Sequence, residues 1–252
     1  MSDIALGMEV SINPQADSTR SMLVRGIVKE VLTSNQDHPH GVKVVLESGD
    51  IGRVKEVHTS VSPNVSSPDS HSINNLLAKG EDHFVELKTS AFWSKYLSPE
   101  KLEKTDSHEV KQHGRRASAF IIAKSIAGFS NADGGHLFIG IKENKQTDSL
   151  EFTGIKSEFS KLTDQSVDGY RRALIDDVIK PYLPSFFMHR INDHVRMDFP
   201  TVEGNMICYL EILKSKQEIF VTSKKDQFFV RIEASTREIQ GAEIVQYCKS
   251  RF

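Results

Sequence analysis

Three glutamates and one lysine are the residues whose types and spacing suggest chemistry in this chain. Glu81, Glu86 and Lys88 lie together in the segment GEDHFVELK, and Glu143 ends the later segment FSNADGGHLFIGIKE. Three carboxylates that converge beside an amine supply what a divalent-metal phosphodiester site needs. The spacing alone leaves a second interpretation open, in which alternating Glu and Lys side chains form the solvated face of a half-exposed strand.

Two strands must bring these side chains together. An alternating apolar run that closes at Glu143 predicts one strand, and a shorter strand is expected behind a glycine break. Because side chains on a strand alternate between its faces, Glu86 and Lys88 share one face while their apolar neighbours point into a core. Glu81 has the wrong parity to join them from a regular strand. We therefore expect it to come from the turn after a short helix at residues 73–79.

A longer pattern extends these two segments into a family resemblance. The pattern is E-x4-E-x-K, then a helix ending in (A/G)-F-(A/S)-N-x-x-G-G, then an apolar strand closing in G-(I/V)-x-(D/E). The matching residues are Glu81, Glu86, Lys88, Gly128, Phe129, Asn131, Gly134, Gly135, Gly140 and Glu143. The pattern resembles the Schlafen core domain, also called the AlbA-type or divergent AAA domain, over residues 73–252.

This resemblance implies a metal-dependent endoribonuclease that cleaves structured RNA, with tRNA the favoured class. Glu81, Glu86 and Glu143 would then be catalytic residues that hold Mg²⁺ or Mn²⁺. Lys88 would be the catalytic cation at the scissile phosphate. Active Schlafen nucleases resemble one another in having Asp at the third acidic position, where this chain has Glu143. The longer side chain puts the metal at that position in question.

The resemblance also bears on assembly and on other functions. Vertebrate Schlafen cores join two related lobes into a clamp, and this chain has one, so a homodimer is expected to rebuild the clamp. A non-catalytic nucleic-acid-binding or transcription-regulatory protein is the alternative function. A third possibility is an adaptor whose N-terminal domain docks on a ribosome or a protein partner.

The first 58 residues contain short strand-like segments separated by turns, which predicts a small β barrel. The expected strands are 8–12, 22–32, 41–47 and 51–57. The segment resembles the small YwbE-like domain of bacteria and some archaea. The matching residues include Gly7, Gly26, Ile27, Val28, Leu32, Thr33, His38, Pro39, Gly41, Lys43, Val44, Gly49, Gly52, Arg53 and Val54. Because that family's function is poorly defined, the partner of the barrel is unknown.

Two features of the expected barrel have more than one interpretation. His38 and His40 share a loop at a spacing that suits a metal, but without a third ligand in view a surface or turn-stabilising role is favoured. Lys43, Arg53 and Lys55 can meet a phosphate backbone. Nucleic-acid binding by the barrel is thus an option that the sequence does not require.

Composition sets the domain boundaries and the expected compartment. Residues 59–72 are rich in Ser, Pro and Asn, which predicts a flexible linker between a barrel at 1–58 and a Schlafen-like domain at 73–252. The formal net charge is −2, so any nucleic-acid surface must be local. Cys208 and Cys248 are expected to be ordinary thiols. With no apolar run of about 20 residues, we expect a soluble, cytoplasmic protein without a membrane segment.

Several residues outside the acidic motif are candidates for binding nucleic acid. Arg115 and Arg116 begin a helix, where cations oppose the helix dipole unless an anion or an acidic neighbour compensates. The C-terminal part adds the candidates Lys214, Lys224, Lys225, Arg231 and Arg237. Trp93 and its aromatic neighbours either stack on unpaired bases or cover the core, and the second is favoured. The pair Gly134-Gly135 precedes a strand rather than a helix, which disfavours nucleotide binding.

The remaining patterns predict the scaffold. Helices are expected at 117–130, 168–180 and 241–251, and hairpins at 189–213 and 219–232. Ser235 and Glu238 fit a capping box. Together these expectations describe an α+β protein in which an N-terminal small β barrel is tethered to a Schlafen-like mixed sheet with packed helices.

Overall fold

The chain consists of two compact units in a computed structural model, Met1–Ser66 and Ser67–Phe252, and each is described by itself. The structure describes residue 4 and residues 9–14, 23–33, 42–57, 70–78, 80–144, 146–147 and 149–252. Most of the expected linker, residues 59–69, lies outside the described residues, as do His38 and His40. The last three residues of that segment are helical, because the first helix begins at Ser70.

The first unit is a closed antiparallel barrel of four strands, as predicted. The strands are β1 (Glu9–Pro14), β2 (Val24–Val31), β3 (Lys43–Leu46) and β4 (Ile51–Val57). Alternate side chains such as Val10, Ile12 and Val44 are fully buried inside it. Lys43 and Arg53 are direct cross-strand neighbours on β3 and β4.

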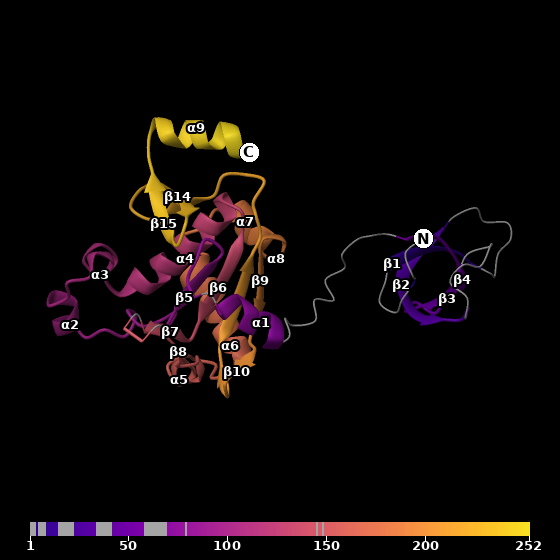
Figure 1. Cartoon of the computed structure of the whole chain (residues 1–252), viewed down its shortest axis with the longest axis horizontal. Coiled ribbons are helices and arrows are strands. Elements are labelled where there is room, and N and C mark those ends of the chain that lie inside the picture. Colours follow the sequence, from indigo (N-terminus) through magenta and orange to yellow (C-terminus); the bar gives the residue numbers. More distant parts are fainter. Residues whose placement is uncertain are drawn as a thin grey trace. The chain divides into compact units, whose positions relative to one another are not determined.

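The second unit holds the remaining helices and strands (Figure 1). Its helices are α1 (Ser70–Leu77), α2 (Pro99–Glu103), α3 (His108–His113), α4 (Ala117–Asn131), α5 (Lys156–Phe159), α6 (Val167–Ala173), α7 (Ser185–His189), α8 (Ile191–His194) and α9 (Ala242–Arg251), with a 3₁₀ turn at Gly114–Arg116 and a π-helix at Leu174–Ile179. Its strands are β5 (Val85–Lys88), β6 (Gly135–Ile139), β7 (Ile141–Asn144), β8 (Ser149–Phe152), β9 (Val195–Asp198), β10 (Thr201–Val202), β11 (Asn205–Met206), β12 (Cys208–Ile212), β13 (Phe220–Thr222), β14 (Asp226–Ile232) and β15 (Ser235–Ile239). Over the described ranges, no helix combines the length and the apolar character that crossing a membrane requires.

A mixed four-stranded sheet forms the centre of this unit, in the order β5-β6-β12-β9. β5 and β6 are parallel, with Glu86 opposite Leu137 and Lys88 opposite Ile139, and the other pairs are antiparallel. Parallel neighbours need a long crossover, and the segment between β5 and β6 supplies it with α2, α3 and α4. β5 is left at the edge of the sheet.

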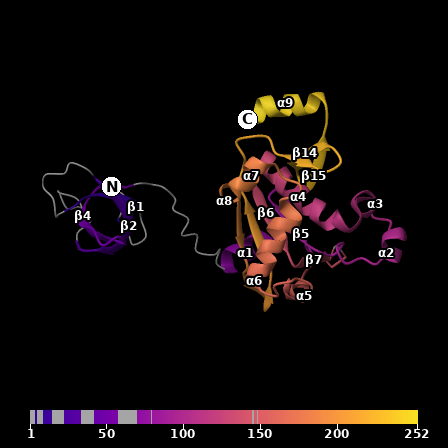
Figure 2. The ribbon, with the colours of Figure 1, turned by 180° about the vertical axis from the view of Figure 1, so that it is seen from behind.

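Helices cover both faces of the sheet (Figures 1 and 2). On one face, α1 packs in a core that includes Ile73, Leu87 and Phe138. On the other face, α4 and α6 pack in a larger core with Ile126 and Leu137. α4 is buried along most of its length because it lies between the sheet and the β13-β14-β15 sheet. The helix expected at 117–130 is thus confirmed.

The two glycines at the start of β6 are explained by close packing of the backbone. Gly134 has φ +80°, and a Cβ atom there would lie 2.7 Å from the carbonyl oxygen of Ile212. A Cβ atom on Gly135 would lie 2.4 Å from the Phe129 ring and 2.8 Å from the Phe84 carbonyl oxygen. Any larger residue would therefore push β6 away from α4 and from the residue that precedes β5.

Three of the expected C-terminal elements differ in the structure. In the hairpin expected at 189–213, the first residues are helical (α7 and α8), and the pairing of β9 with β12 begins at Val195. Ser235–Ile239 is the strand β15, paired with β14, so the capping box expected at Ser235 and Glu238 is wrong. The helix expected at 168–180 is α6 continued by a π-helix, not one regular α-helix. The hairpin of β13 and β14 is confirmed. For Ser235–Ile239, pairing with β14 satisfies the backbone N–H and C=O groups that a helix would have satisfied internally.

Asn131, at the end of α4, joins that helix to the C-terminal hairpin. Its fully buried amide donates to the carbonyl oxygens of Ile219 and Phe229 and accepts from the Ile219 N–H, each at 2.8 Å. The signature residue Asn131 is thus a structural link between α4 and the β13-β14-β15 sheet.

We predict that Asn131→Ala lowers the free energy of unfolding by about 3 kcal/mol or more, because three buried backbone groups lose their partners. Urea unfolding of the full chain, followed by fluorescence, measures this in the second unit alone, since Trp93 is the single tryptophan. The control is Asn205→Ala, which removes one exposed hydrogen bond to Glu203 and should change stability little. Equal effects of the two substitutions would contradict this role of Asn131.

Candidate functional site

The outer edge of β5 is satisfied by side chains instead of a neighbouring strand. Glu81 Oε1 accepts the Leu87 N–H at 2.9 Å, and Asp82 Oδ1 accepts the Val85 N–H at 2.8 Å. The Arg231 guanidinium donates to the Val85 carbonyl oxygen at 2.9 Å. An edge strand otherwise presents open backbone groups. Glu81 therefore has a structural role, and it reaches β5 from the preceding turn as its parity predicts.

Glu86 forms two ion pairs on the face of β5 that it shares with Lys88, as predicted. Its Oε1 contacts the Lys88 ammonium, and its Oε2 contacts the Arg231 guanidinium. The Arg231 side chain is 0% exposed and the Glu86 side chain 12%. The Lys88 ammonium also lies 3.9 Å from Glu81 Oε1. Glu81 and Glu86 thus lie on either side of one ammonium.

Glu143 approaches this group from β7. A Cβ atom on Gly80 would lie 3.2 Å from Glu143 Oε1, so the carboxylate lies beside the residue that precedes Glu81. Carboxylates are the donors that Mg²⁺ and Mn²⁺ prefer. However, across the described ranges, no three Asp, Glu, His or Cys side chains are close enough to hold one ion. Because cations take both oxygens of Glu86, the expected three-carboxylate ligand set does not fit an ion as it stands here.

A cavity of about 420 Å³ opens beside Glu86 and Lys88. We call it the Trp93 cavity, and its walls come from β5, from the loop after β5, from α4 and from the β14–β15 turn. The lining residues include Glu86, Lys88, Trp93, Glu109, Lys124, Ser125, Ser235 and Thr236. It places solvent-accessible space next to the ion pairs of Glu86.

Two residues important for this region were missed in the sequence. Lys124 lines the Trp93 cavity, and a signal was present, since it is the single charged residue in the apolar stretch 117–131. Glu158 is 6% exposed and accepts hydrogen bonds from the Phe92 N–H at 3.1 Å and the Tyr170 hydroxyl at 2.9 Å. Nothing in its surrounding sequence indicates that role, because its partners lie in other segments.

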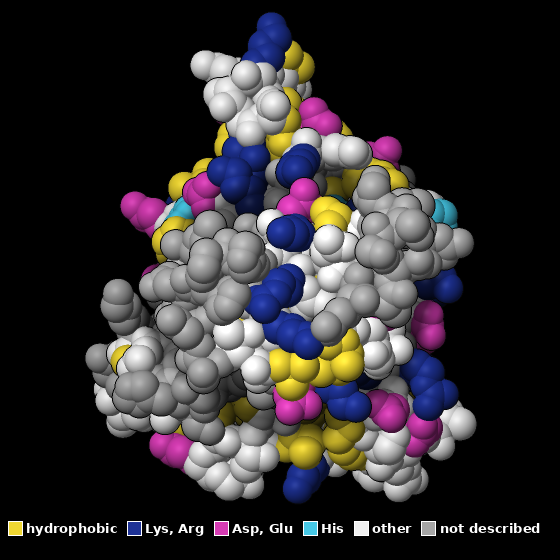
Figure 3. Space-filling view, turned by 90° about the vertical axis from the view of Figure 1, so that its right-hand side faces the viewer, with side chains coloured by type: hydrophobic (Ala, Val, Ile, Leu, Met, Phe, Trp, Pro, Cys, Tyr) yellow, Lys and Arg dark blue, Asp and Glu magenta, His cyan; other side chains and the backbone are white. Residues whose placement is uncertain are grey.

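The predicted basic residues do not form one surface. Arg231 differs most from its prediction, because it is buried against Glu86 and unavailable to a surface ligand. Several others already have partners: Arg115 donates to the Leu97 carbonyl, Lys214 pairs with Asp133 at 3.0 Å and lowers the pKa of that carboxyl, and Lys225 pairs with Glu238 at 3.2 Å. Arg116, Lys224 and Arg237 are exposed. On the face drawn in Figure 3, basic and acidic side chains both occur.

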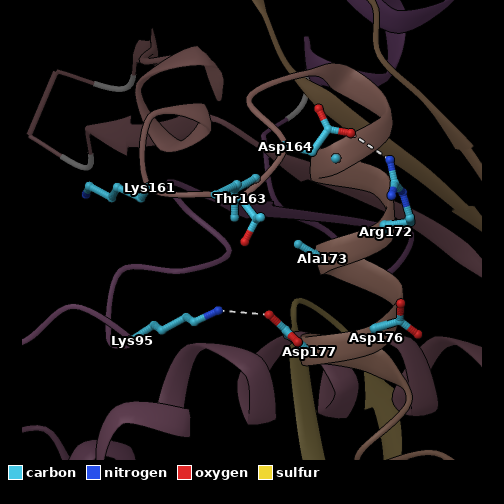
Figure 4. Close-up of a pocket in the computed structure, with 10 residues that line it drawn as sticks. Lys95, Lys161, Thr163, Asp164, Arg172, Ala173, Asp176 and Asp177 are labelled. Atoms are coloured by element: carbon cyan, nitrogen blue, oxygen red, sulfur yellow. Dashed lines mark hydrogen bonds and ion pairs between the residues drawn. The ribbon is translucent and has the colours of Figure 1, made fainter.

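A second, smaller hollow of about 220 Å³ is lined mostly by charged residues (Figure 4). Lys95 points toward Asp177 at 2.8 Å, and Arg172 toward Asp164 at 2.6 Å. These charges compensate one another within the hollow. Lys161 also lines the hollow, and like Lys124 in the Trp93 cavity it makes no ion pair within the described part of the chain.

Comparison with known proteins assigns both units. Residues 81–240 match the model of the family described as Schlafen, AlbA_2. The chain belongs to this family. Membership indicates a function connected with nucleic acid.

Residues 1–57 match an uncharacterized conserved protein family, DUF2196. Over 54 residues the chain is 46% identical to the uncharacterized protein YwbE of Bacillus subtilis (strain 168), a match that covers 21% of this chain and 83% of that protein.

One solved structure also resembles this Schlafen-family chain. It is the crystal structure of the DIP2311 protein from Corynebacterium diphtheriae, with a TM-score of 0.40 and 18% sequence identity. The match covers 67% of this chain but 24% of that one, so this chain spans about a quarter of the other protein's length.

Breaking the Glu86–Arg231 pair should destabilise the Schlafen-like unit strongly. We predict that Glu86→Ala lowers its free energy of unfolding by about 3–5 kcal/mol, because a fully buried guanidinium loses its carboxylate. Urea unfolding followed by Trp93 fluorescence measures the change. Glu151→Ala, which removes an exposed pair with Lys142, is the control and should stay within about 0.5 kcal/mol.

A double variant separates pairing from packing. Glu86→Leu combined with Arg231→Met removes both charges and should be less destabilised than Glu86→Ala alone. If the double variant were the less stable of the two, the cost would come from lost packing and not from an unpaired charge.

Proposed function

We propose that this Schlafen-family chain is a metal-dependent endoribonuclease that acts on structured RNA, with tRNA the favoured class. The observation that carries the proposal is that two glutamates contact the Lys88 ammonium and that a third glutamate lies beside the segment of one of them. Glu81 and Glu86 flank its ammonium, and Glu143 lies beside the residue before Glu81. Membership of a family connected with nucleic acid supports the substrate class.

The side chains would have distinct tasks in this activity. Glu81, Glu86 and Glu143 are the candidate ligands of Mg²⁺ or Mn²⁺. Such an ion would polarise the phosphate and activate water when bound. Since Lys88 and Arg231 now take both oxygens of Glu86, ion binding requires Lys88 to release Glu86. Lys88 would then be free to pair with a phosphate oxygen, while buried Arg231 keeps Glu86 in position.

We predict that the chain cleaves total tRNA in the presence of Mn²⁺ and not in EDTA. Glu81→Gln and Glu143→Gln should lower the cleavage rate by more than about 100-fold, because each loses a metal ligand. Glu151→Gln, an exposed neighbour on β8, is the matched control and should cleave normally. Gel electrophoresis of the RNA gives the rates. Cleavage that persists in both site variants would remove the proposed site.

A second candidate function is a non-catalytic nucleic-acid-binding or regulatory protein. The observation that favours it is that Glu81 and Glu86 both have structural partners, since Glu81 caps the edge of β5 and Glu86 neutralises Arg231. The same experiment separates the two functions. Tight binding of tRNA with no cleavage by the wild-type chain would support the binder.

We also propose that two copies of the chain assemble to form the clamp that the family resemblance implies. Light scattering coupled to gel filtration at micromolar concentration should then give twice the mass of one chain. A monomer under these conditions, with or without tRNA, would refute the dimer. The cleavage assay is independent of this result.

A further inference from the structure

The Trp93 cavity combines three kinds of chemical group beside Glu86. Trp93 contributes an aromatic surface and is 39% exposed. Lys88 and Lys124 contribute ammonium groups, while Ser125 and Thr236 contribute hydroxyls. An aromatic face, a cation and hydroxyl groups match the base, the phosphate and the sugar of a nucleotide, in that order.

The exposure of Trp93 results from how its neighbours are anchored. Phe92, on one side, is 2% exposed, and its N–H is held by the buried carboxylate of Glu158. Ser94, on the other side, is 0% exposed, and its hydroxyl accepts the Ser118 N–H at 2.8 Å. The backbone on both sides of Trp93 is therefore fixed, so a ligand that stacks on its ring has little loop entropy to remove.

The charges that line the cavity leave one lysine without a direct ion pair. Two of the lining residues are cations, Lys88 and Lys124, and two are carboxylates, Glu86 and Glu109. Glu86 is neutralised within its own ion pairs. Lys124 makes no ion pair with any described residue, and its ammonium lies 5.8 Å from the centre of the Phe229 ring. It acts on Glu109 only at longer range, where it helps to lower the pKa of that carboxyl, so Lys124 is the lining cation that no described carboxylate contacts directly.

We propose that the Trp93 cavity is a subsite for one unpaired nucleotide of an RNA strand. The base stacks on Trp93, the phosphate contacts Lys124, and the next phosphate lies toward Lys88. A base within a duplex has both faces covered by its neighbours, so only an unpaired base offers a face to the indole ring. The inference rests on the proposed action on RNA and makes it more specific: the strand must be unpaired at the site.

The test uses the fact that Trp93 is the single tryptophan of the chain. The wild-type chain is titrated in EDTA, which prevents cleavage, with a short single-stranded RNA, with the same RNA annealed to its complement, with AMP and with inorganic phosphate. We expect the single-stranded RNA to quench the indole fluorescence at the lowest concentration. Equal quenching by the duplex, or quenching by AMP alone, would overturn the proposal.

Variants then test the contacts by binding of labelled single-stranded RNA. Trp93→Ala should weaken binding by about 5- to 100-fold, and Trp93→Phe by less, since stacking is partly kept. Tyr96→Ala is the matched control, because Tyr96 is 41% exposed and does not line the cavity. Lys124→Gln should reduce the salt dependence of binding by about one phosphate contact. If Lys124→Gln leaves the salt dependence of binding unchanged, the proposed phosphate position is wrong. This test does not depend on whether the Trp93 variants fold.

The experiments distinguish failure of the nucleotide subsite from failure of the proposed nuclease activity. Quenching by single-stranded RNA without Mn²⁺-dependent cleavage supports the subsite and rejects the nuclease. Cleavage of tRNA with no change in Trp93 fluorescence rejects the subsite and supports the nuclease.

Discussion

The buried ion pair between Glu86 and Arg231 determines how the Schlafen-like unit is assembled around its site. The Arg231 guanidinium joins segments 145 residues apart. It donates to the Asp82 and Val85 carbonyl oxygens and lies 4.8 Å from the centre of the Phe129 ring. One side chain thus connects the C-terminal sheet with the edge of β5 and with the end of α4. Buried ion pairs contribute little net stability, but replacing one partner alone is strongly destabilising because it leaves the other charge buried and unpaired. The pair therefore fixes where Glu86 lies more than how stable the unit is.

The fold was predictable from the sequence where local pattern and tertiary environment agree. The alternation of β5 placed Glu86 and Lys88 on one face correctly, since one side of that strand is a core and the other is the site. The barrel strands and α4 were also predicted correctly, since their local sequence patterns agree with their surroundings in the fold. β14 was predicted as a strand, but the face of each of its residues was not, because the strand is buried from Gln227 to Arg231. A strand covered on both faces has no period-two signal, so Arg231 could be placed on a surface by its residue type alone.

The aromatic loop shows why the site itself was harder to predict. Sequence composition favoured a core role for Trp93 and its neighbours, and the structure assigns that role to Phe92 while Trp93 faces the cavity. The choice is made by Glu158, which is 66 residues away in the sequence and holds the Phe92 N–H. A contact between such distant residues leaves no trace in local spacing. The side chain that orients the loop is therefore visible only in the folded chain.

The charge arrangement around Glu86 is the local feature on which the proposed binding of a polyanion by a nearly neutral chain depends. With a net charge of −2, long-range attraction is weak and screened within about 10 Å at moderate salt. What remains is local: Lys88 pairs with Glu86, and among the described residues Lys124 makes no ion pair and is attracted by Glu109 at longer range. An approaching phosphate competes with Glu86 for Lys88, and losing that contact costs little because Arg231 still neutralises Glu86. The buried pair thus lets Lys88 change partners without leaving an uncompensated carboxylate, which is the physical condition for one lysine to serve both the folded chain and the proposed RNA ligand.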